Sequence, residues 1–404
     1  MNIVYLNHYA GSPALGMEYR PYYLAREWVR LGHRVQMLAA DFSHVRSVQP
    51  RAGDETIDGI DYRFYATPRY SGNGVGRALN IWRFLRQVWA DSERVVRDFK
   101  PQRVIASSTY PLDIWVARRM ARAARAKLVF EVHDLWPLSP VELAGMPRWH
   151  PFIMLCQAAE DAAYRDADAV VSMLPKVHDY MASRGLAPGK LHIVPNGITL
   201  EEWQGEPPPL RDDVAQVLRA ARQAGRLVVG YAGAHGLPNA LDTLLDAAQH
   251  LRDQPLHFVL VGDGHEKARL AQRVAHESLH HMSLLPPIPK VQIPSLLRAL
   301  DIAYIGWQRV PIYRFGIAPN KLMDYMMAGC AVLHSVQAGN DPVAEAGCGL
   351  TVAPESAQAV AAGLLRLRDI GAEARRAMGE RGRAFVLAHH TYPVLAQRFL
   401  EALK

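Results

Sequence analysis

The chain has 404 residues, half of them apolar and 21% charged, so it can bury a large core and is long enough for two domains. Its three cysteines, Cys156, Cys330 and Cys348, are far apart and odd in number, which disfavours a disulfide framework and indicates a reducing compartment. No leader pattern precedes the first apolar run, and no run approaches the roughly 18 residues of a membrane span, so we expect a cytoplasmic protein.

In the first half, short apolar runs alternate with helical patterns. Strands are expected over residues 3–7, 34–39, 103–106, 127–132 and 169–173. Helices are expected near residues 17–31, 77–99, 111–125 and 152–166. This alternation predicts a parallel sheet covered by helices on both faces. The run at residues 191–194 then enters Pro195-Asn196-Gly197, which is strong turn punctuation.

The net charge of +7 is concentrated between Arg69 and Lys127, where thirteen Lys and Arg face four Asp and Glu. Trp82, Phe84, Leu85 and Trp89 lie among these cations. Apolar wedges among arginines favour peripheral contact with an anionic membrane surface, here the inner face of the plasma membrane. We expect no nucleic-acid partner, because no nucleic-acid-binding motif accompanies the charge. An ordinary solvated helix face stays open as the alternative.

A second alternation follows Gly205-Glu206-Pro207-Pro208-Pro209, which we interpret as a stiff linker between two domains. Its strands are expected over residues 227–232, 256–261, 282–285, 301–305 and 330–335. Its helices are expected over residues 239–251, 265–276, 291–298, 319–328, 357–368, 373–386 and 392–403. The predicted fold class is therefore α/β, with two Rossmann-like parallel-sheet domains. Ligands of such sheets bind at the carboxyl ends of the strands.

Three glycine-containing turns follow predicted strands, at residues 7–16, 231–236 and 261–264. Each leaves a strand and opens toward a helix, where free amides and the helix dipole favour a phosphate group. A tight turn without a ligand is the alternative for each of them.

The most informative segment is residues 315–329. Pro319 starts a helix there, and Lys321 and Asp324 are spaced to share one face of its first turn. An anion could contact the free amides and Lys321, while Asp324 accepts hydrogen bonds from a diol such as ribose. In the alternative, Asp324 only stabilises the helix start and pairs with Lys321.

Residues 315–329 resemble the nucleotide-sugar motif of the retaining GT-B glycosyltransferases of family 4. Further segments follow in the family's order: residues 32–35, 131–137, 194–198, 260–264 and 341–350. The resemblance implies two domains facing a central cleft, residues 1–198 with a C-terminal helix at 388–404, and residues 199–387. It also implies that this last helix crosses back to the first domain, with hinges near 195–209 and 389–393.

The resemblance also implies roles for single residues. Asp324 would bind the ribose, and Ile288 would lie against the base. Lys321, Asn320 and nearby amides, with Gly233, would bind the diphosphate, and the backbone of Gly316, Ile317 and Ala318 would face the donor sugar. In the first domain, Gly16 would let its loop approach the diphosphate, and His133, with Asp134 and Glu18, would face the reacting sugar.

Some positions depart from the family pattern. Ala234 and Asn239 stand where an arginine and a lysine are usual, so His235 or Arg314 is expected to help neutralise the diphosphate. Gly316 and Asp324 stand where two glutamates are common.

The expected activity is retaining transfer from a UDP-sugar, with N-acetyl-fucosamine-type donors suggested by the Asp134-Leu135-Trp136-Pro137 form. The acceptor would be a lipid-linked oligosaccharide of O-antigen or capsule synthesis. No cofactor and no metal are expected, since Asp166-Ala167-Asp168 lies at a helix end and no other ligand spacing is present. A non-hydrolysing UDP-sugar 2-epimerase and a non-catalytic nucleotide-sugar-binding partner subunit remain alternatives.

Overall fold

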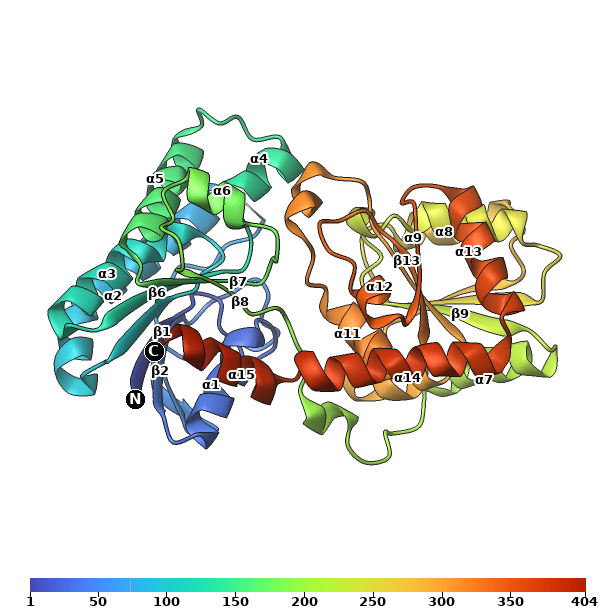
Figure 1. Cartoon of the computed structure of the whole chain (residues 1–404), viewed down its shortest axis with the longest axis horizontal. Helices are drawn as coiled ribbons and strands as arrows, with labels where there is room; N and C mark the ends of the chain where they lie inside the picture. Colours follow the sequence, from blue (N-terminus) through green and yellow to red (C-terminus); the bar gives the residue numbers. More distant parts are fainter. Residues whose placement is uncertain (73) are drawn as a thin grey trace. The chain divides into compact units, whose positions relative to one another are not determined.

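The computed structural model describes residues 1–72 and 74–404, which form two compact units (Figure 1). Unit 1 comprises Met1–Asn196 and Tyr392–Lys404, and unit 2 comprises Gly197–Thr391. Each unit contains its own largely parallel sheet with helices packed on it, so the expected α/β class with two Rossmann-like units is confirmed. The domain borders expected at 198 and 388 differ from the observed division by a few residues.

The sheet of unit 1 has eight strands in the order β3-β4-β2-β1-β5-β6-β7-β8. The strands are β1 Asn2–Leu6, β2 Arg34–Ala40, β3 Gly53–Ile57, β4 Ile60–Tyr65, β5 Arg103–Ala106, β6 Lys127–Val132, β7 Ala169–Ser172 and β8 Leu191–Ile193. The helices are α1 Arg20–Arg30, α2 Val75–Phe99, α3 Ile114–Ala124, α4 Leu138–Ala144, α5 Pro151–Asp166, α6 His178–Ser183 and α15 Tyr392–Ala402.

One edge of this sheet is antiparallel, which the expectation of a parallel sheet did not include. Strand β3 pairs antiparallel with β4 through the turn Asp58-Gly59, where both residues have positive φ, 49° and 79°. Asp-Gly is a favoured pair for such a tight hairpin turn. Strand β3 is polar and mostly exposed, so its sequence lacks the apolar run by which the buried strands are recognised.

The sheet of unit 2 is parallel, with the order β11-β10-β9-β12-β13-β14. The strands are β9 Leu227–Ala232, β10 Leu256–Val261, β11 Met282–Leu285, β12 Ile302–Gly306, β13 Ala331–Ser335 and β14 Gly349–Val352. The helices are α7 Asp212–Gln223, α8 Leu241–His250, α9 Lys267–His276, α10 Ile293–Arg298, α11 Asn320–Met327, α12 Pro342–Ala346, α13 Ala357–Asp369 and α14 Gly371–His389. This strand order reverses between β9 and β12, as in a dinucleotide-binding sheet.

The last helix, α15, belongs to unit 1, as expected. Phe399 is fully buried there, and its ring meets that of Trp28 in α1 edge-on, with ring centroids 5.1 Å apart. Trp28 Nε1 also donates to the Ala396 carbonyl at 3.1 Å. The C-terminal helix therefore completes the core of unit 1.

The proline-rich stretch at residues 205–209 is not a linker between the units, contrary to the expectation. It lies inside unit 2, where Gln292 Nε2 donates to the Pro209 carbonyl at 2.8 Å and Ser295 Oγ to the Pro208 carbonyl at 2.7 Å. The chain instead passes from unit 1 to unit 2 between Asn196 and Gly197, inside the Pro195-Asn196-Gly197 turn.

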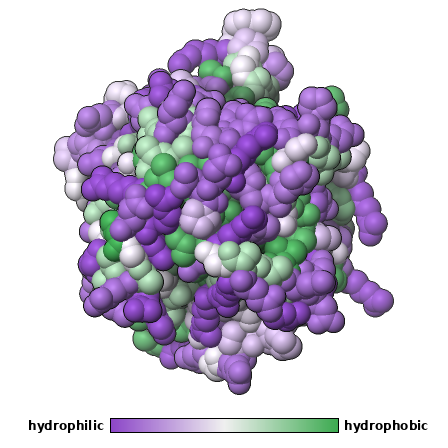
Figure 2. Space-filling view, turned by 90° about the vertical axis from the view of Figure 1, so that its right-hand side faces the viewer, coloured by the Kyte–Doolittle hydropathy of each residue, from purple (hydrophilic) through white to green (hydrophobic). Residues whose placement is uncertain are grey.

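Apolar side chains are concentrated in the cores of the two units. The side of unit 2 that carries α8 and α13 is predominantly hydrophilic, with small separate apolar areas (Figure 2). Among residues 1–72 and 74–404, no helix combines the length and the apolar character that are needed to cross a bilayer.

Candidate active site

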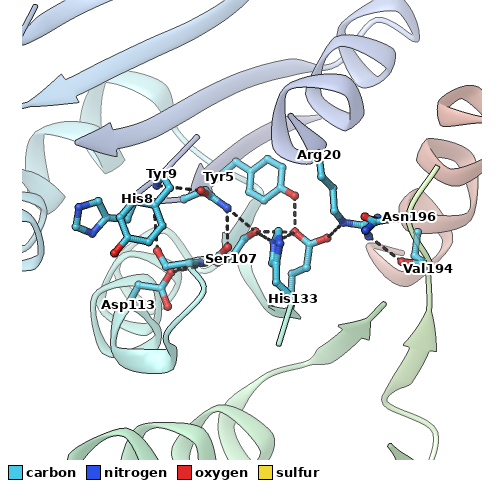
Figure 3. A network of polar contacts seen from close by, with 12 residues as sticks. Tyr5, His8, Tyr9, Arg20, Ser107, Asp113, His133, Val194 and Asn196 are labelled. Carbon is cyan, nitrogen blue, oxygen red and sulfur yellow. Dashed lines mark hydrogen bonds and ion pairs between the residues drawn. The ribbon is translucent and has the colours of Figure 1, made fainter. Parts of the chain in front are cut away.

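In unit 1, the strand order reverses between β1 and β5, so the loops that follow these strands diverge and leave room for polar side chains. His133 follows the neighbouring strand β6 and is 8% exposed. Ser107 follows β5, and its hydroxyl lies 2.8 Å from His133 Nε2 (Figure 3). This end of the sheet therefore holds the histidine predicted from the sequence.

The ionisation of His133 is set mainly by one buried carboxylate. Glu131, the penultimate residue of β6, has Oε2 3.4 Å from His133 Nε2 and is fully buried. Burial alone would lower the pKa of His133, but the charge of Glu131 and its hydrogen bond raise it, and the charge of Glu18 adds to this. Glu18 and Asp134 thus both lie near enough to interact with the imidazole: Glu18 helps to raise the pKa of His133, and the charge of His133 acts on Asp134.

Gly16 has a structural reason to be glycine. Its φ of +101° lies in the region that side chains disfavour, and a Cβ would come within 2.8 Å of Ser47 N and Oγ. The loop of residues 7–16 is thereby held against residues 46 and 47 in unit 1. Its approach to a diphosphate remains a prediction.

In unit 2, the two glycine-rich turns pack against each other. Gly233 N donates to Val261 O at 3.0 Å, and His235 N donates to Asp263 O at 2.8 Å. A Cβ on Gly262 would come within 1.9 Å of Gly233 O, so a glycine is required there. The amides of Gly233 and His235 are therefore occupied within the protein, so these two N–H groups are not free for a phosphate as expected.

Lys321, in the first turn of α11, reaches back to the turn after β9. Its Nζ donates to Tyr231 Oη at 2.8 Å and to Asn239 Oδ1 at 2.7 Å. A Cβ added at Gly233 would lie 3.3 Å from Lys321 Nζ, so the lysine also approaches Gly233 closely. Burial lowers the pKa of Lys321 to about 8. Within the described part of the chain it forms no ion pair, so its charge is available to a bound anion.

His235 is fully buried beside this lysine, and neither ring nitrogen has a hydrogen-bond partner among the described residues. Burial, together with the charges of Lys267 and Lys321, lowers its pKa to about 4. The imidazole is therefore neutral at pH 7. His235 consequently supplies a polar N–H rather than a second positive charge.

Asp324 lies one turn further along α11, on the same side of the helix as Lys321. Burial raises its pKa to about 7, and the charge of Glu202 adds to the shift while Lys290 opposes it. Lys290 Nζ lies 2.5 Å from Glu202 Oε1, and Ile288 precedes Lys290 by two residues. The structure thus brings the predicted ribose and base residues, Asp324 and Ile288, to one part of unit 2. Asp324 does not pair with Lys321.

The segment before α11 is held by a residue that sequence reasoning did not identify. Asn340 Oδ1 accepts from Ile317 N at 2.7 Å, and Asn340 Nδ2 donates to Ile317 O at 3.1 Å. Gly316 has φ +104°, which favours glycine. The exposed Arg314 stacks on the Phe315 ring at 4.2 Å, Ala318 is half-buried, and Asn320 is exposed at the start of α11.

Two residues that shape the site, Asn340 and Arg20, carried no recognisable local signal, and Glu131 lay in the recognised segment 131–137 without a role of its own. Arg20 Nε lies 2.9 Å from Glu131 Oε1 although 111 positions separate them. Only the position of Glu131, two residues before His133, could have drawn attention to it. Asp166 is occupied by ion pairs with Arg118 and Arg165, and Asp168 accepts from Leu128 N. Across the residues that the structure describes, no three His, Cys, Asp or Glu side chains gather as a metal site requires.

Comparison with protein families gives two separate matches. Residues 16–197 match the glycosyl transferase 4-like domain, and residues 226–369 match the glycosyl transferases group 1. A curated relative, the putative colanic acid biosynthesis glycosyl transferase WcaI of Escherichia coli strain K12, is 24% identical over 276 residues. That stretch covers 66% of each chain, just under two thirds of the relative's length.

Solved structures resemble the chain over almost its whole length. Sucrose-phosphate synthase of Thermosynechococcus elongatus has a TM-score of 0.74 at 17% identity, covering 99% of this chain and 98% of that one. HepE of Anabaena in complex with UDP has a TM-score of 0.68 at 16% identity, covering 100% and 99%. At these identities the likeness establishes the fold.

Proposed function

Since this chain is a family 4 glycosyltransferase with the GT-B fold, we propose that it transfers a sugar with retention from a UDP-sugar to a lipid-linked glycan during synthesis of a bacterial surface polysaccharide. The observation that carries the proposal is the first turn of α11, where Lys321 and Asp324 occupy one side of the helix. A cation for the diphosphate and a carboxylate for the ribose are there only one turn apart.

The donor would lie across this turn. Lys321 forms no ion pair with the described residues. It would therefore bind the diphosphate, together with the free amides of the α11 N-terminus. Asp324 would bind the ribose hydroxyls, and Ile288 would contact the base. His235 and the exposed Arg314 would supply further donors, and the backbone of Gly316–Ala318, fixed by Asn340, would face the sugar.

Negative charge grows on the leaving diphosphate in the transition state, so donors fixed around that group should contribute most to the rate. In the retaining reaction that we propose, the acceptor hydroxyl attacks from the side the diphosphate leaves, and a phosphate oxygen takes its proton. His133 would orient the reacting sugar. Lys321 and the helix dipole would supply the positive charge that a metal provides elsewhere, so we propose a metal-independent enzyme.

Two finer points rest on similarity alone. The likeness to WcaI, described as a colanic acid biosynthesis enzyme, supports a surface polysaccharide as the product. The Asp134-Leu135-Trp136-Pro137 form and residues 315–325 resemble those of transferases with N-acetyl-fucosamine-type donors and so support an N-acetylated deoxyhexosamine as the sugar. The basic, aromatic surface of unit 1 supports a lipid-linked oligosaccharide as the acceptor.

The aromatic and basic face of α2 and α3 supports peripheral contact with an anionic membrane. Trp82 and Trp89 are 52% and 45% exposed, and Arg119 lies over the Trp89 ring at 4.9 Å. Phe84, which was expected at this surface, is instead fully buried in the core. Tryptophan beside arginine suits the headgroup region.

Vesicle flotation tests this contact. Vesicles containing phosphatidylglycerol should bind the wild type, and Trp82→Ser/Trp89→Ser should release it, whereas Leu237→Ser, at an exposed leucine of unit 2, should not. Binding that ignores both the tryptophans and the lipid charge would refute the proposed surface.

The activity is tested with a panel of labelled UDP-sugars and a polyprenyl-diphosphate-linked acceptor in EDTA. We expect a labelled lipid product whose anomeric configuration matches that of the donor. Conversion of the free UDP-sugar into its 2-epimer without acceptor would instead identify an epimerase. Donor binding without any turnover would identify a non-catalytic partner subunit.

A further inference from the structure

His133 belongs to a network of buried polar side chains in unit 1 (Figure 3). This network includes a carboxylate that the packing of the histidine does not require. Glu131 is 0% exposed, and its carboxylate accepts hydrogen bonds from Arg20, Tyr5 and Ser107. Burial alone would raise the pKa of Glu131, but the charges of Arg20 and His133 and the hydrogen bonds from His133 and Ser107 together hold it well below its usual range. A permanently ionised, buried carboxylate therefore stands directly behind His133.

The hydrogen-bond directions place a proton on Nε2 of the imidazole. The Ser107 hydroxyl donates to Glu131 Oε2 at 2.6 Å, so its oxygen accepts from His133 Nε2–H at 2.8 Å. Among the described residues, Nδ1 has no hydrogen-bond partner, and the side chain keeps 8% exposure. Nδ1 is consequently the atom that a ligand can reach.

Arg20 extends the network to the chain segment that leaves unit 1. While Nε holds Glu131, Nη1 donates to the Pro195 carbonyl at 2.7 Å and Nη2 to the Val194 carbonyl at 2.8 Å. Unit 1 ends at Asn196, one residue later. Arg20 thus joins the carboxylate behind His133 to residues 194 and 195.

We propose that Glu131 is a positioning residue that holds His133 as the imidazolium, with Nδ1–H presented to the donor, and that Arg20 anchors this arrangement to the segment entering unit 2. Resting on the proposed function, this gives His133 a cationic role: its Nδ1–H would donate to a hydroxyl or a phosphate oxygen of the UDP-sugar. Arg20, by neutralising Glu131, keeps that carboxylate from repelling the same ligand.

Several charged or titratable groups face this imidazole and contribute to its protonation. They come from the strands, helix and loops packed around it: Glu131 in β6, Tyr5 in β1, Arg20 in α1, Glu18 in the first loop, Asp113 beyond β5 and Asp134 directly after His133. Only Glu131 combines full burial with ionisation and direct contact, so its removal should have the largest effect.

Glu131→Gln, followed by NMR titration of the His133 ring, tests the proposal without requiring turnover. We expect the titration midpoint to fall by about one pH unit or more, because the opposite charge in contact is lost. Glu160→Gln is the matched control, since Glu160 is equally buried in unit 1 but bonds to Tyr164, Tyr180 and Gln157 instead. It should leave the midpoint unchanged.

If Glu131→Gln does not fold, because Arg20 is left unpaired, Arg20→Met/Glu131→Gln removes both charges and should lower the midpoint in the same direction. In transfer assays, kcat should fall about ten- to a hundredfold with little change in the donor KM, and Glu131→Asp should recover part of it.

An unchanged His133 midpoint in the folded variants would overturn the proposal. A midpoint that falls while UDP-sugars are neither bound nor transferred would leave the positioning role intact and refute the proposed function. The two failures are therefore distinguishable.

Discussion

Lys321 Nζ lies 2.7 Å from Asn239 Oδ1. Asn239 occupies a position where a lysine is usual in the family. Ala234 likewise stands where an arginine is usual, so two cations of the family pattern are missing, and the Asn239 amide oxygen holds Lys321 in place. The diphosphate site that we propose therefore depends on Lys321 more heavily than the family pattern would require.

UDP binding should accordingly weaken as the pH rises. The pKa of Lys321 is lowered to about 8, so the free protein loses this charge between about pH 7 and 9. We expect the UDP affinity to fall several-fold across this range in the wild type. Lys321→Arg, which stays charged, should remove the pH dependence. An equal loss of affinity in Lys321→Arg would show that another group titrates.

Asp324 should make the unliganded protein less stable above pH 4. Folding raises its pKa to about 7 from an unfolded value near 4, so its stability contribution is complete below about pH 4 and is lost as the pH rises toward 7. Asp324→Asn should therefore raise the stability at pH 8 by about 1–2 kcal/mol while weakening UDP binding. Thermal unfolding at pH 4 and pH 8 measures this, with the exposed Asp253→Asn as control. A destabilised Asp324→Asn would contradict it.

Asn340 should affect the sugar more than the nucleotide. Asn340→Ala removes both hydrogen bonds to the Ile317 backbone and frees the segment that we place beside the donor sugar. We expect kcat/KM for the UDP-sugar to fall about tenfold or more, with the affinity for UDP changed much less. Comparable losses for UDP and UDP-sugar would indicate that Asn340 supports the whole donor site.

The sequence pattern predicted the parts of the molecule that local signals specify. Most of the buried strands, the helix that follows Pro319 and the Lys321–Asp324 spacing are of this kind. Strands β4 and β14 were not predicted, although Ile60, Tyr62 and Phe64 of β4 are buried. The polar strand β3 was not predicted because almost none of its side chains are buried, although Asp58-Gly59 is a typical pair for its turn.

The remaining features depend on contacts between distant positions. Three sets of contacts join residues that are far apart in the chain. Arg20 pairs with Glu131, Asn340 bonds to the Ile317 backbone, and the carbonyls of Pro208 and Pro209 are bound within unit 2. Local composition cannot distinguish a proline-rich linker from a proline-rich segment that Gln292 and Ser295 bind.

The C-terminal helix should be required for the stability of unit 1. Phe399→Ala should cost about 3–5 kcal/mol, because the ring is fully buried against Trp28. The exposed Gln397→Ala is the control in chemical denaturation. Truncation after Val386 removes α15 entirely and should abolish folding of unit 1 or activity. A truncated chain with wild-type stability and activity would contradict the role of α15.

Calorimetric titration of UDP in EDTA, with GDP and ADP as comparisons, tests the central claim most directly. The account predicts selective binding of UDP by the wild type and its loss in both Asp324→Ala and Lys321→Ala. Absence of binding, or binding that neither substitution changes, would contradict the donor site placed on the first turn of α11.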